Sequence, residues 1–175
     1  MARTIKTEAL VLRKYSLPNE DRIITLFTKD RGKMSVVAKG IKKITSRRLP
    51  HMETANLVRA TLSQTRDRFY LQDSTLLSGF TALKTASRKI DLMYFYFFIL
   101  EYILPPEQPE SHIYTSTLHF MVQLSEAESA DTFPILSYLN NLLKMLGYSN
   151  ADMTFESLCR AVEGIIHKKL PEISI

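Results

Sequence analysis

The spacing of apolar residues changes near residue 79, and this change limits the folds that the chain can adopt. Before residue 79, apolar and polar residues tend to alternate with a period of two, which is typical of half-buried β-strands. After it, apolar residues recur every three or four positions, which is typical of amphipathic helices. The chain has 175 residues, enough for one ordinary domain or two small ones. The pattern therefore predicts a strand domain over residues 1–78 and a helical domain over residues 79–175.

Five segments of the first part read as strands, and a longer link separates the third from the fourth. This arrangement is typical of a small closed barrel of the OB type. In the third strand, alternation places Met34, Val36 and Ala38 inside the barrel and Lys33 and Lys39 outside. The predicted fold class is α+β, an N-terminal five-stranded OB-fold barrel followed by an all-α helical domain. The expected strands cover residues 7–17, 21–29, 33–39, 51–64 and 68–77.

The second part contains four expected helices. The first covers residues 80–104, and its aromatic run from Tyr94 to Phe98 indicates core packing on several sides rather than a ligand pocket. The second covers residues 112–127, after a proline-rich break. The third begins near Pro134 and ends before Gly147, and Asp152 or Thr154 is expected to cap the fourth.

Positive charge is concentrated in the strand domain. The stretch 32–48, GKMSVVAKGIKKITSRR, contains six Lys or Arg residues and no acidic residue. Residues 1–50 carry a net charge of +9, whereas residues 51–175 carry −4, and residues 90–143 contain seven acids and no Lys or Arg. Such polarity between the two parts indicates two surfaces with different partners, of which the basic one suits an anionic polymer.

Signatures of catalysis and of metal binding are scarce. The sequence has no G-x-S-x-G, P-loop or G-x-G-x-x-G motif, and its four His residues show no H-E-x-x-H spacing. The single cysteine, Cys159, lies in the apolar stripe of the last expected helix, which indicates a core thiol rather than a nucleophile. We therefore expect a non-enzymatic protein with no metal site and no cofactor.

The cellular setting is also constrained. One cysteine excludes an internal disulfide framework, and the N-terminus lacks the apolar segment of a signal peptide. The most apolar run, residues 92–100, is too short to span a bilayer as a helix, which needs roughly 20 residues. We expect a cytoplasmic protein without a membrane partner.

The candidate nucleic-acid contacts are the cations of the barrel and of the connector over residues 40–50. Their neutralisation of phosphates would give an affinity that falls with salt, and exposed aromatic rings would add stacking platforms for unpaired bases. We expect Lys33, Lys39, Arg47 and Arg48 to converge on one surface, and alternation is expected to bury about half of the aromatic candidates. The cationic candidates are Arg13, Lys14, Arg22, Lys33, Lys39, Lys42, Lys43, Arg47, Arg48, Arg59, Arg66 and Arg68, and the aromatic ones are Tyr15, Phe27, Phe69 and Tyr70.

About 40 consecutive residues resemble the N-terminus of the bacterial RecO family of recombination mediators. The family pattern combines an opening T-E-A strand, then E-x-D-R-I-x-T-L-x-T, then G-K-x-S-x-V-A-x-G and a basic tail. Here these elements are residues 7–9, residues 19–28 and residues 32–40, with Asn19 in place of the first Glu of the pattern. Residues 133–148, which end in Leu-Gly-Tyr, resemble a helix of the same family more weakly.

The resemblance implies an OB-fold followed by a helical domain. It also implies binding of single- and double-stranded DNA, annealing of complementary strands, and help in loading recombinase during DNA repair. The implied protein partners are RecR and the acidic tail of single-strand-binding protein, with the recombinase filament as an indirect partner. Many relatives carry a four-cysteine zinc motif, which one cysteine cannot form, and the helical part is shorter than is usual in the family.

Two other interpretations of the sequence remain open. An RNA-binding OB-fold module would use the same stacking and backbone charge, because nothing in the sequence reads a 2′-hydroxyl. A protein-interaction module without nucleic-acid binding would use the acidic helical part and leave the basic stretch solvated.

Overall fold

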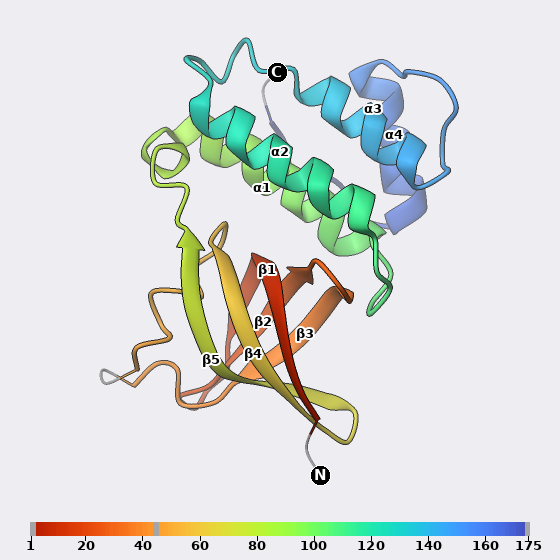
Figure 1. The fold of residues 1–175 in the computed structure, drawn as a ribbon. Helices are drawn as coiled ribbons and strands as arrows, with labels where there is room; N and C mark the ends of the chain where they lie inside the picture. Colours follow the sequence, from red (N-terminus) through yellow and green to blue (C-terminus); the bar gives the residue numbers. More distant parts are fainter. Residues whose placement is uncertain (1–2, 44–45, 174–175) are drawn as a thin grey trace. The chain divides into compact units, whose positions relative to one another are not determined.

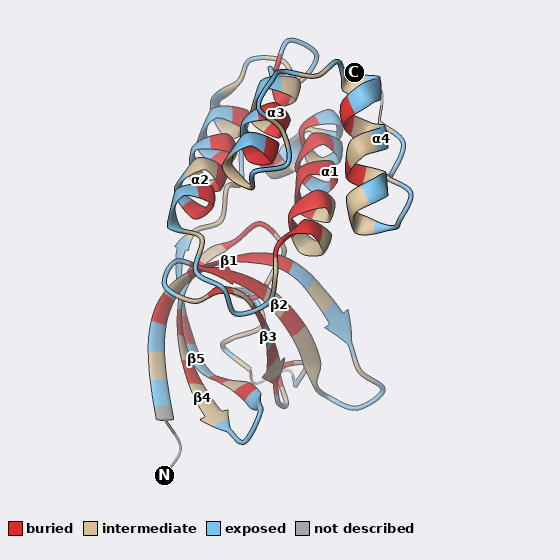
Figure 2. Ribbon diagram, turned by 90° about the vertical axis from the view of Figure 1, so that its right-hand side faces the viewer, coloured by how far each residue is buried: buried red, intermediate tan, exposed pale blue. Residues whose placement is uncertain are grey.

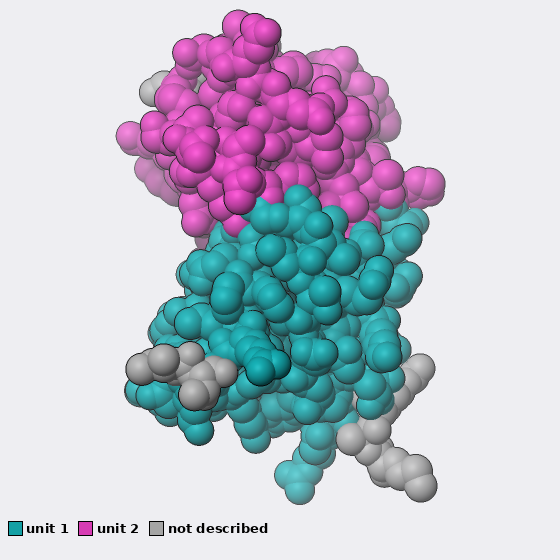
Figure 3. Space-filling view, turned by 60° about the vertical axis from the view of Figure 1, so that its left-hand side comes forward, with its two compact units in different colours: residues 1–79, 105–111 teal, residues 80–104, 112–175 magenta. Residues whose placement is uncertain are grey.

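The chain forms two compact units, which Figure 3 colours separately. The first comprises residues 1–79 and 105–111, and the second comprises residues 80–104 and 112–175. The computed structural model describes residues 3–43 and 46–173, so residues 44 and 45 of the basic connector lie outside the described part.

The first unit is a closed five-stranded barrel, as the alternation of apolar residues predicts (Figure 1). Around the barrel the strands follow the order β1-β2-β3-β5-β4, and β1 pairs with β4 to close it. All neighbouring strands are antiparallel except β3 and β5, which are parallel. The strands are β1 (Arg3–Ser16), β2 (Arg22–Thr28), β3 (Gly32–Ala38), β4 (Leu57–Thr65) and β5 (Arg68–Ser78).

Buried and exposed residues alternate along these strands, as Figure 2 shows. In β3, Met34, Val36 and Ala38 are buried in the barrel core, which confirms the predicted inward face. The fourth strand begins at Leu57 rather than at residue 51. Residues 47–55 are in turns instead, because the Asn56 side chain donates to the carbonyls of residues 50 and 51 and Ala55 adopts a φ of 70°.

The shortest seam of the barrel lies between β3 and β5. Their ladder contains only the pairs Val36 with Phe69 and Val37 with Tyr70. Just beyond it, the Arg48 guanidinium donates from Nη1 to the Leu71 carbonyl and from Nη2 to the Lys39 carbonyl, both at 2.8 Å. Because one planar guanidinium bonds to the backbone on both sides of the seam, Arg48 extends the connection between β3 and β5 beyond the point where backbone pairing stops.

The proline-rich segment 105–111 is fastened to the start of β3. The Glu107 N–H donates to the Lys33 carbonyl at 2.8 Å, and Lys33 and Pro106 form an isolated β-bridge. Gly32 allows this approach, because a Cβ at that position would lie 1.8 Å from the Gln108 carbonyl oxygen. Its φ of +68° is a second reason for glycine at this turn.

The second unit is helical, as predicted. The first helix begins at Ser87 rather than near residue 80, since Phe80 has a positive φ and the Thr85 hydroxyl bonds locally to the Ala82 carbonyl. Thr154 caps the last helix, because its hydroxyl accepts from the Ser157 N–H. The elements are the 3-10 helix η1 (Leu83–Thr85) and the helices α1 (Ser87–Ile103), α2 (Ser111–Glu126), α3 (Ile135–Met145) and α4 (Phe155–Ile166).

The middle of the aromatic run of α1 is core packing, as the sequence indicates, whereas Tyr94 at its start is 51% exposed. Phe95, Tyr96 and Phe97 are all buried, and the Tyr96 ring stacks on Phe120 of α2 with centroids 4.1 Å apart. Burial raises the pKa of Tyr96 to about 12, because desolvation disfavours the phenolate. This tyrosine is therefore a neutral residue of the helical core.

We expect Gly32→Ala to destabilise the protein more than Gly147→Ala. Both glycines have positive φ, but a Cβ at Gly147 would meet nothing within 4 Å, whereas at Gly32 it would meet backbone. Gly147→Ala is the control and should lower the free energy of unfolding by roughly 1 kcal/mol, from backbone strain alone. Gly32→Ala should lower it clearly more. Urea unfolding measures both, and equal losses would contradict the close approach of segment 105–111.

Arg48→Lys should lower the free energy of unfolding by about 1 kcal/mol, since an ammonium cannot bridge two carbonyls as the guanidinium does. Arg47→Lys is the matched control, because the neighbouring Arg47 side chain is exposed, and it should change stability by less than about 0.5 kcal/mol. Denaturant titration compares the two variants. Indistinguishable curves would show that the seam does not depend on Arg48.

Candidate nucleic-acid interface

The basic connector between β3 and β4 is anchored to the barrel by apolar side chains. Ile41 and Met52 are fully buried in the barrel core, and Leu49 packs against it. The cations lie between these anchors along the chain. Their backbone is therefore held at the rim of the barrel rather than left in a free loop.

Two adjoining pockets mark this rim. One has a volume of about 430 Å³ and the other about 360 Å³. They share Lys39, Arg48 and Gln72, so we call them together the basic groove. The first is also lined by Gly40, Lys43, Ser46, Arg47 and Asp73, and the second by Ser63, Thr65, Tyr70 and Leu71.

The basic groove brings together four of the predicted cations. Lys39, Lys43 and Arg47 are exposed at its wall, whereas the Arg48 guanidinium is held by the two carbonyls of the seam. Asp73 is the acidic residue among the lining side chains. The groove therefore carries net positive charge on a polar floor, which suits a phosphate backbone.

Three further arginines lie on β4 and β5 or on their turn. Arg66 and Arg68 are exposed at the β4–β5 hairpin tip, beside Thr65 of the groove, with which Arg68 pairs. Arg59 is exposed on β4, four residues from Ser63 and thus about 13 Å away along the strand. Its partner in the ladder is Glu8 of β1.

Other predicted cations have partners elsewhere on the barrel. Lys14 forms an ion pair with Glu53, and Arg22 Nη1 lies 3.6 Å from the same carboxylate. Lys42 Nζ donates to the Leu17 carbonyl at 2.7 Å and so ties the connector to the β1–β2 turn. These three side chains have structural contacts that the sequence did not predict.

The remaining two cations also lie outside the basic groove. Lys33 lies at the start of β3, six residues from Lys39, which is about 20 Å along a strand. The expected convergence therefore holds for Lys39, Arg47 and Arg48 but not for Lys33. Arg13 is exposed on β1, where it pairs with Thr25 of β2.

The structure corrects two of the four aromatic candidates. Phe27 is completely buried and Phe69 is 3% exposed, so neither ring can meet a base. Tyr15 is 59% exposed near the end of β1. Tyr70 lies in the basic groove, where the Lys39 ammonium is 4.7 Å from its ring centroid.

Three uncharged polar residues of β4 and β5 that line the groove were not predicted: Ser63, Thr65 and Gln72. The Gln72 amide donates to the Ser63 hydroxyl at 2.7 Å, which ties β5 to β4 on the outer face. Alternation along the strand could have placed Ser63 and Thr65 on the surface. Both share the outward face of β4, whereas Leu62 is buried. Polar, uncharged side chains at these positions gave no reason to single them out.

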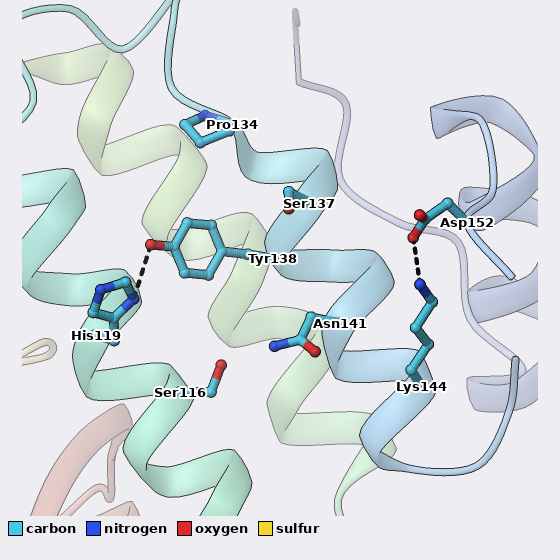
Figure 4. A pocket seen from close by; sticks show the side chains of 8 residues that line it. All are labelled: Ser116, His119, Pro134, Ser137, Tyr138, Asn141, Lys144 and Asp152. Carbon is cyan, nitrogen blue, oxygen red and sulfur yellow. Dashed lines mark hydrogen bonds and ion pairs between the residues drawn. The ribbon is translucent and has the colours of Figure 1, made fainter. Parts of the chain in front are cut away.

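The helical unit has its own pocket, of about 500 Å³, between α2, α3 and Asp152 of the segment leading to α4 (Figure 4). Tyr138 Oη lies 3.1 Å from His119 Nδ1, and Lys144 Nζ lies 2.8 Å from Asp152 Oδ1. Burial raises the pKa of the Tyr138 phenol, so it is neutral at physiological pH. This pocket combines an aromatic wall with one ion pair and hydrogen-bonding groups.

The lone cysteine, Cys159, lies in surroundings that favour the thiol form. Burial, and secondarily Glu163, raises the pKa of Cys159, which disfavours a reactive thiolate. Within residues 3–43 and 46–173, no three His, Cys, Asp or Glu side chains are grouped to hold a metal ion. No helix over those residues is long and apolar enough to cross a bilayer.

Comparison with known proteins agrees with this architecture. The family model described as "Recombination protein O N terminal" matches residues 1–80. The chain is 26% identical over 146 residues to the DNA repair protein RecO of Caldanaerobacter subterraneus, covering 83% of this chain and 59% of that protein. The RecO protein of Thermoanaerobacter sp. gives the same identity and the same coverage.

A match over a shorter segment has a higher sequence identity. The DNA repair protein RecO of Heliobacterium modesticaldum is 51% identical over 45 residues, which cover 26% of this chain and 16% of that protein. The chain thus spans 59% of the length of the first two relatives. The chain is thus similar to RecO proteins over most of its described length, and the N-terminal family model matches the part that forms the barrel.

Proposed function

We propose that this chain is a non-enzymatic, DNA-binding recombination mediator that acts in DNA repair. In this proposal it binds single- and double-stranded DNA, anneals complementary single strands and assists recombinase loading. The observation that carries the proposal is the convergence of Lys39, Lys43 and Arg47 with Arg48 on one groove. The printed name of the relatives, DNA repair protein RecO, points in the same direction.

The proposed mechanism is electrostatic. A strand lying along the groove exchanges its condensed counterions for the fixed cations, and the release of those ions favours binding. A strand neutralised in this way repels its complement less, which favours annealing. Because the cations contact phosphates rather than base edges, binding and annealing should not depend strongly on sequence.

Combined charge reversal at Lys39, Lys43 and Arg47 to Glu should weaken binding of single-stranded DNA by about tenfold or more at low salt. The slope of log affinity against log salt should flatten by about 2, since each lost phosphate contact contributes about 0.7 for a single strand. Fluorescence anisotropy over a salt series measures both quantities. Lys42 is left unchanged, because its bond to Leu17 is structural.

The control reverses Arg160, Lys168 and Lys169 of the helical unit, which are exposed and change the net charge by the same amount. It should leave affinity and slope close to the wild-type values. Equal losses in the two variants would show that net charge, rather than the basic groove, governs binding.

Annealing and strand type are tested with the wild-type chain. We expect faster annealing of complementary strands, also when they are coated by single-strand-binding protein. Competition between matched DNA and RNA oligomers separates the mediator from an RNA-binding module. No binding of either polymer at low salt would favour a protein-interaction module instead.

We further propose that the helical unit meets the protein partners implied by the family, RecR and single-strand-binding protein, with the recombinase filament engaged indirectly. The helical unit has fewer cations than the barrel unit, and Lys144 is the one that lines its pocket. The pocket of Figure 4 offers Lys144 beside Tyr138 and His119, which could hold a carboxylate-rich peptide against an aromatic wall.

Lys144→Glu and Asp152→Asn should therefore act in opposite directions on this partner. The Lys144 ammonium is shared with Asp152, so removing that carboxylate frees the cation, whereas reversing Lys144 repels the peptide. Calorimetric titration with the acidic tail peptide of single-strand-binding protein should show tighter binding to Asp152→Asn and weaker binding to Lys144→Glu. If both variants bind like the wild type, the peptide does not use this pocket.

A further inference from the structure

Tyr70 occupies a defined position on the outside of the barrel. It lies on β5 between Phe69 and Leu71, which are 3% and 2% exposed in the core, so its own side chain points outward. Its backbone is paired with Val37 of β3 on one side and with Ser63 of β4 on the other. The ring is thus carried by a strand fixed on both edges, which makes it a rigid platform.

The ring of Tyr70 is covered by Lys39. The ammonium lies 4.7 Å from the ring centroid, within the range of a cation–π contact. Lys39 is exposed and its long stem is flexible, so this cover is held only weakly. An unpaired base is a larger and flatter partner for the ring and can replace the ammonium there.

The surroundings of the ring complete a small site. The pocket of about 360 Å³ is within the size range of small-ligand sites, and it is bounded by the hydroxyls of Ser63 and Thr65 and the amide of Gln72. These groups can face the polar edge of a base without selecting one base. On the other side of Lys39, the cations Lys43 and Arg47 line the pocket that would receive the flanking phosphates.

We propose that Tyr70 and Lys39 form a subsite for one unpaired base of single-stranded nucleic acid. The base stacks on Tyr70, and the displaced Lys39 ammonium pairs with a neighbouring phosphate. A base in a duplex stays in its own stack and cannot enter, so this subsite favours single strands, whereas the cations of the groove serve both strand types. The inference rests on the proposed nucleic-acid binding and adds strand selectivity to it.

The test uses Tyr70→Trp in the full chain. The protein contains no Trp, so this residue becomes the sole indole reporter. It is titrated with a dye-labelled oligothymidylate and with a blunt duplex of equal length, following indole emission and dye anisotropy together. Quenching by the single strand, with none by the bound duplex, is the expected result.

Affinity measurements provide an independent readout. Tyr70→Leu should weaken single-strand binding on the order of tenfold, the usual loss for one stacked base, and leave duplex binding within about twofold. Tyr70→Phe should retain wild-type affinity, because the ring is kept. Tyr148→Leu removes a 49% exposed tyrosine of the helical unit and should change neither affinity.

Lys39→Met distinguishes the two roles of the lysine. Quenching of the Trp reporter should persist, while the single-strand salt slope falls by about 0.7 as one phosphate contact is lost. If anisotropy shows binding but the indole is not quenched and Tyr70→Leu binds normally, the subsite is wrong and the proposed function stands. If the wild-type chain binds neither oligomer at low salt, the proposed function itself fails.

Discussion

The burial of two apolar side chains of the connector determines where its charges can lie. Ile41 and Met52 are fully buried in the barrel core, and burying such side chains stabilises a fold by about 1.5–3 kcal/mol each. The cations between them cannot follow into the core, because an unpaired buried charge costs far more than this. They are therefore displayed at the rim, and the position of the basic groove follows from the hydrophobic pattern of the connector.

Like charges on the barrel repel one another. Some of the cations are paired with a carboxylate, whereas others contact neutral groups. Away from the groove, Lys14 and Arg22 share the Glu53 carboxylate, which offsets one of their two positive charges. Lys39 instead rests on the Tyr70 ring, and Arg48 donates to carbonyls. These are interactions with neutral groups, and they leave the positive charge uncompensated. The basic residues are thus divided between those that hold the barrel together and those that can meet a polyanion.

The sequence predicted the barrel because strand parity is a local property. The inward face of β3 and the buried positions of β4 could be predicted from alternation alone. The same rule was too weak for Phe27, because Leu26, Phe27 and Thr28 are all buried in succession and both faces of β2 are covered there. Parity cannot show when the outer face of a strand is also buried.

The roles of individual cations were not predictable for a different reason. Lys42 and Arg48 bind the backbone carbonyls of Leu17, Leu71 and Lys39. Every residue has a carbonyl, so the sequence does not indicate which of them an arginine or a lysine will reach. Composition therefore identified the basic surface, but only the topology separates its structural members from its exposed ones.

The strand β3 links two features that lie at opposite ends of it. At its start, Gly32 and Lys33 receive the segment 105–111, and just beyond its end Lys39 lines the basic groove. A strand with ladders on both sides cannot shift one end independently of the other, since a slip in register would turn its buried residues outward. The groove consequently rests on a stiff base, and its adaptability to a ligand lies in side chains such as Lys39. This arrangement suits a polymer bound through its phosphates. The spacing of the phosphates varies along a flexible nucleic-acid strand, and long side chains on a stiff sheet can follow that variation.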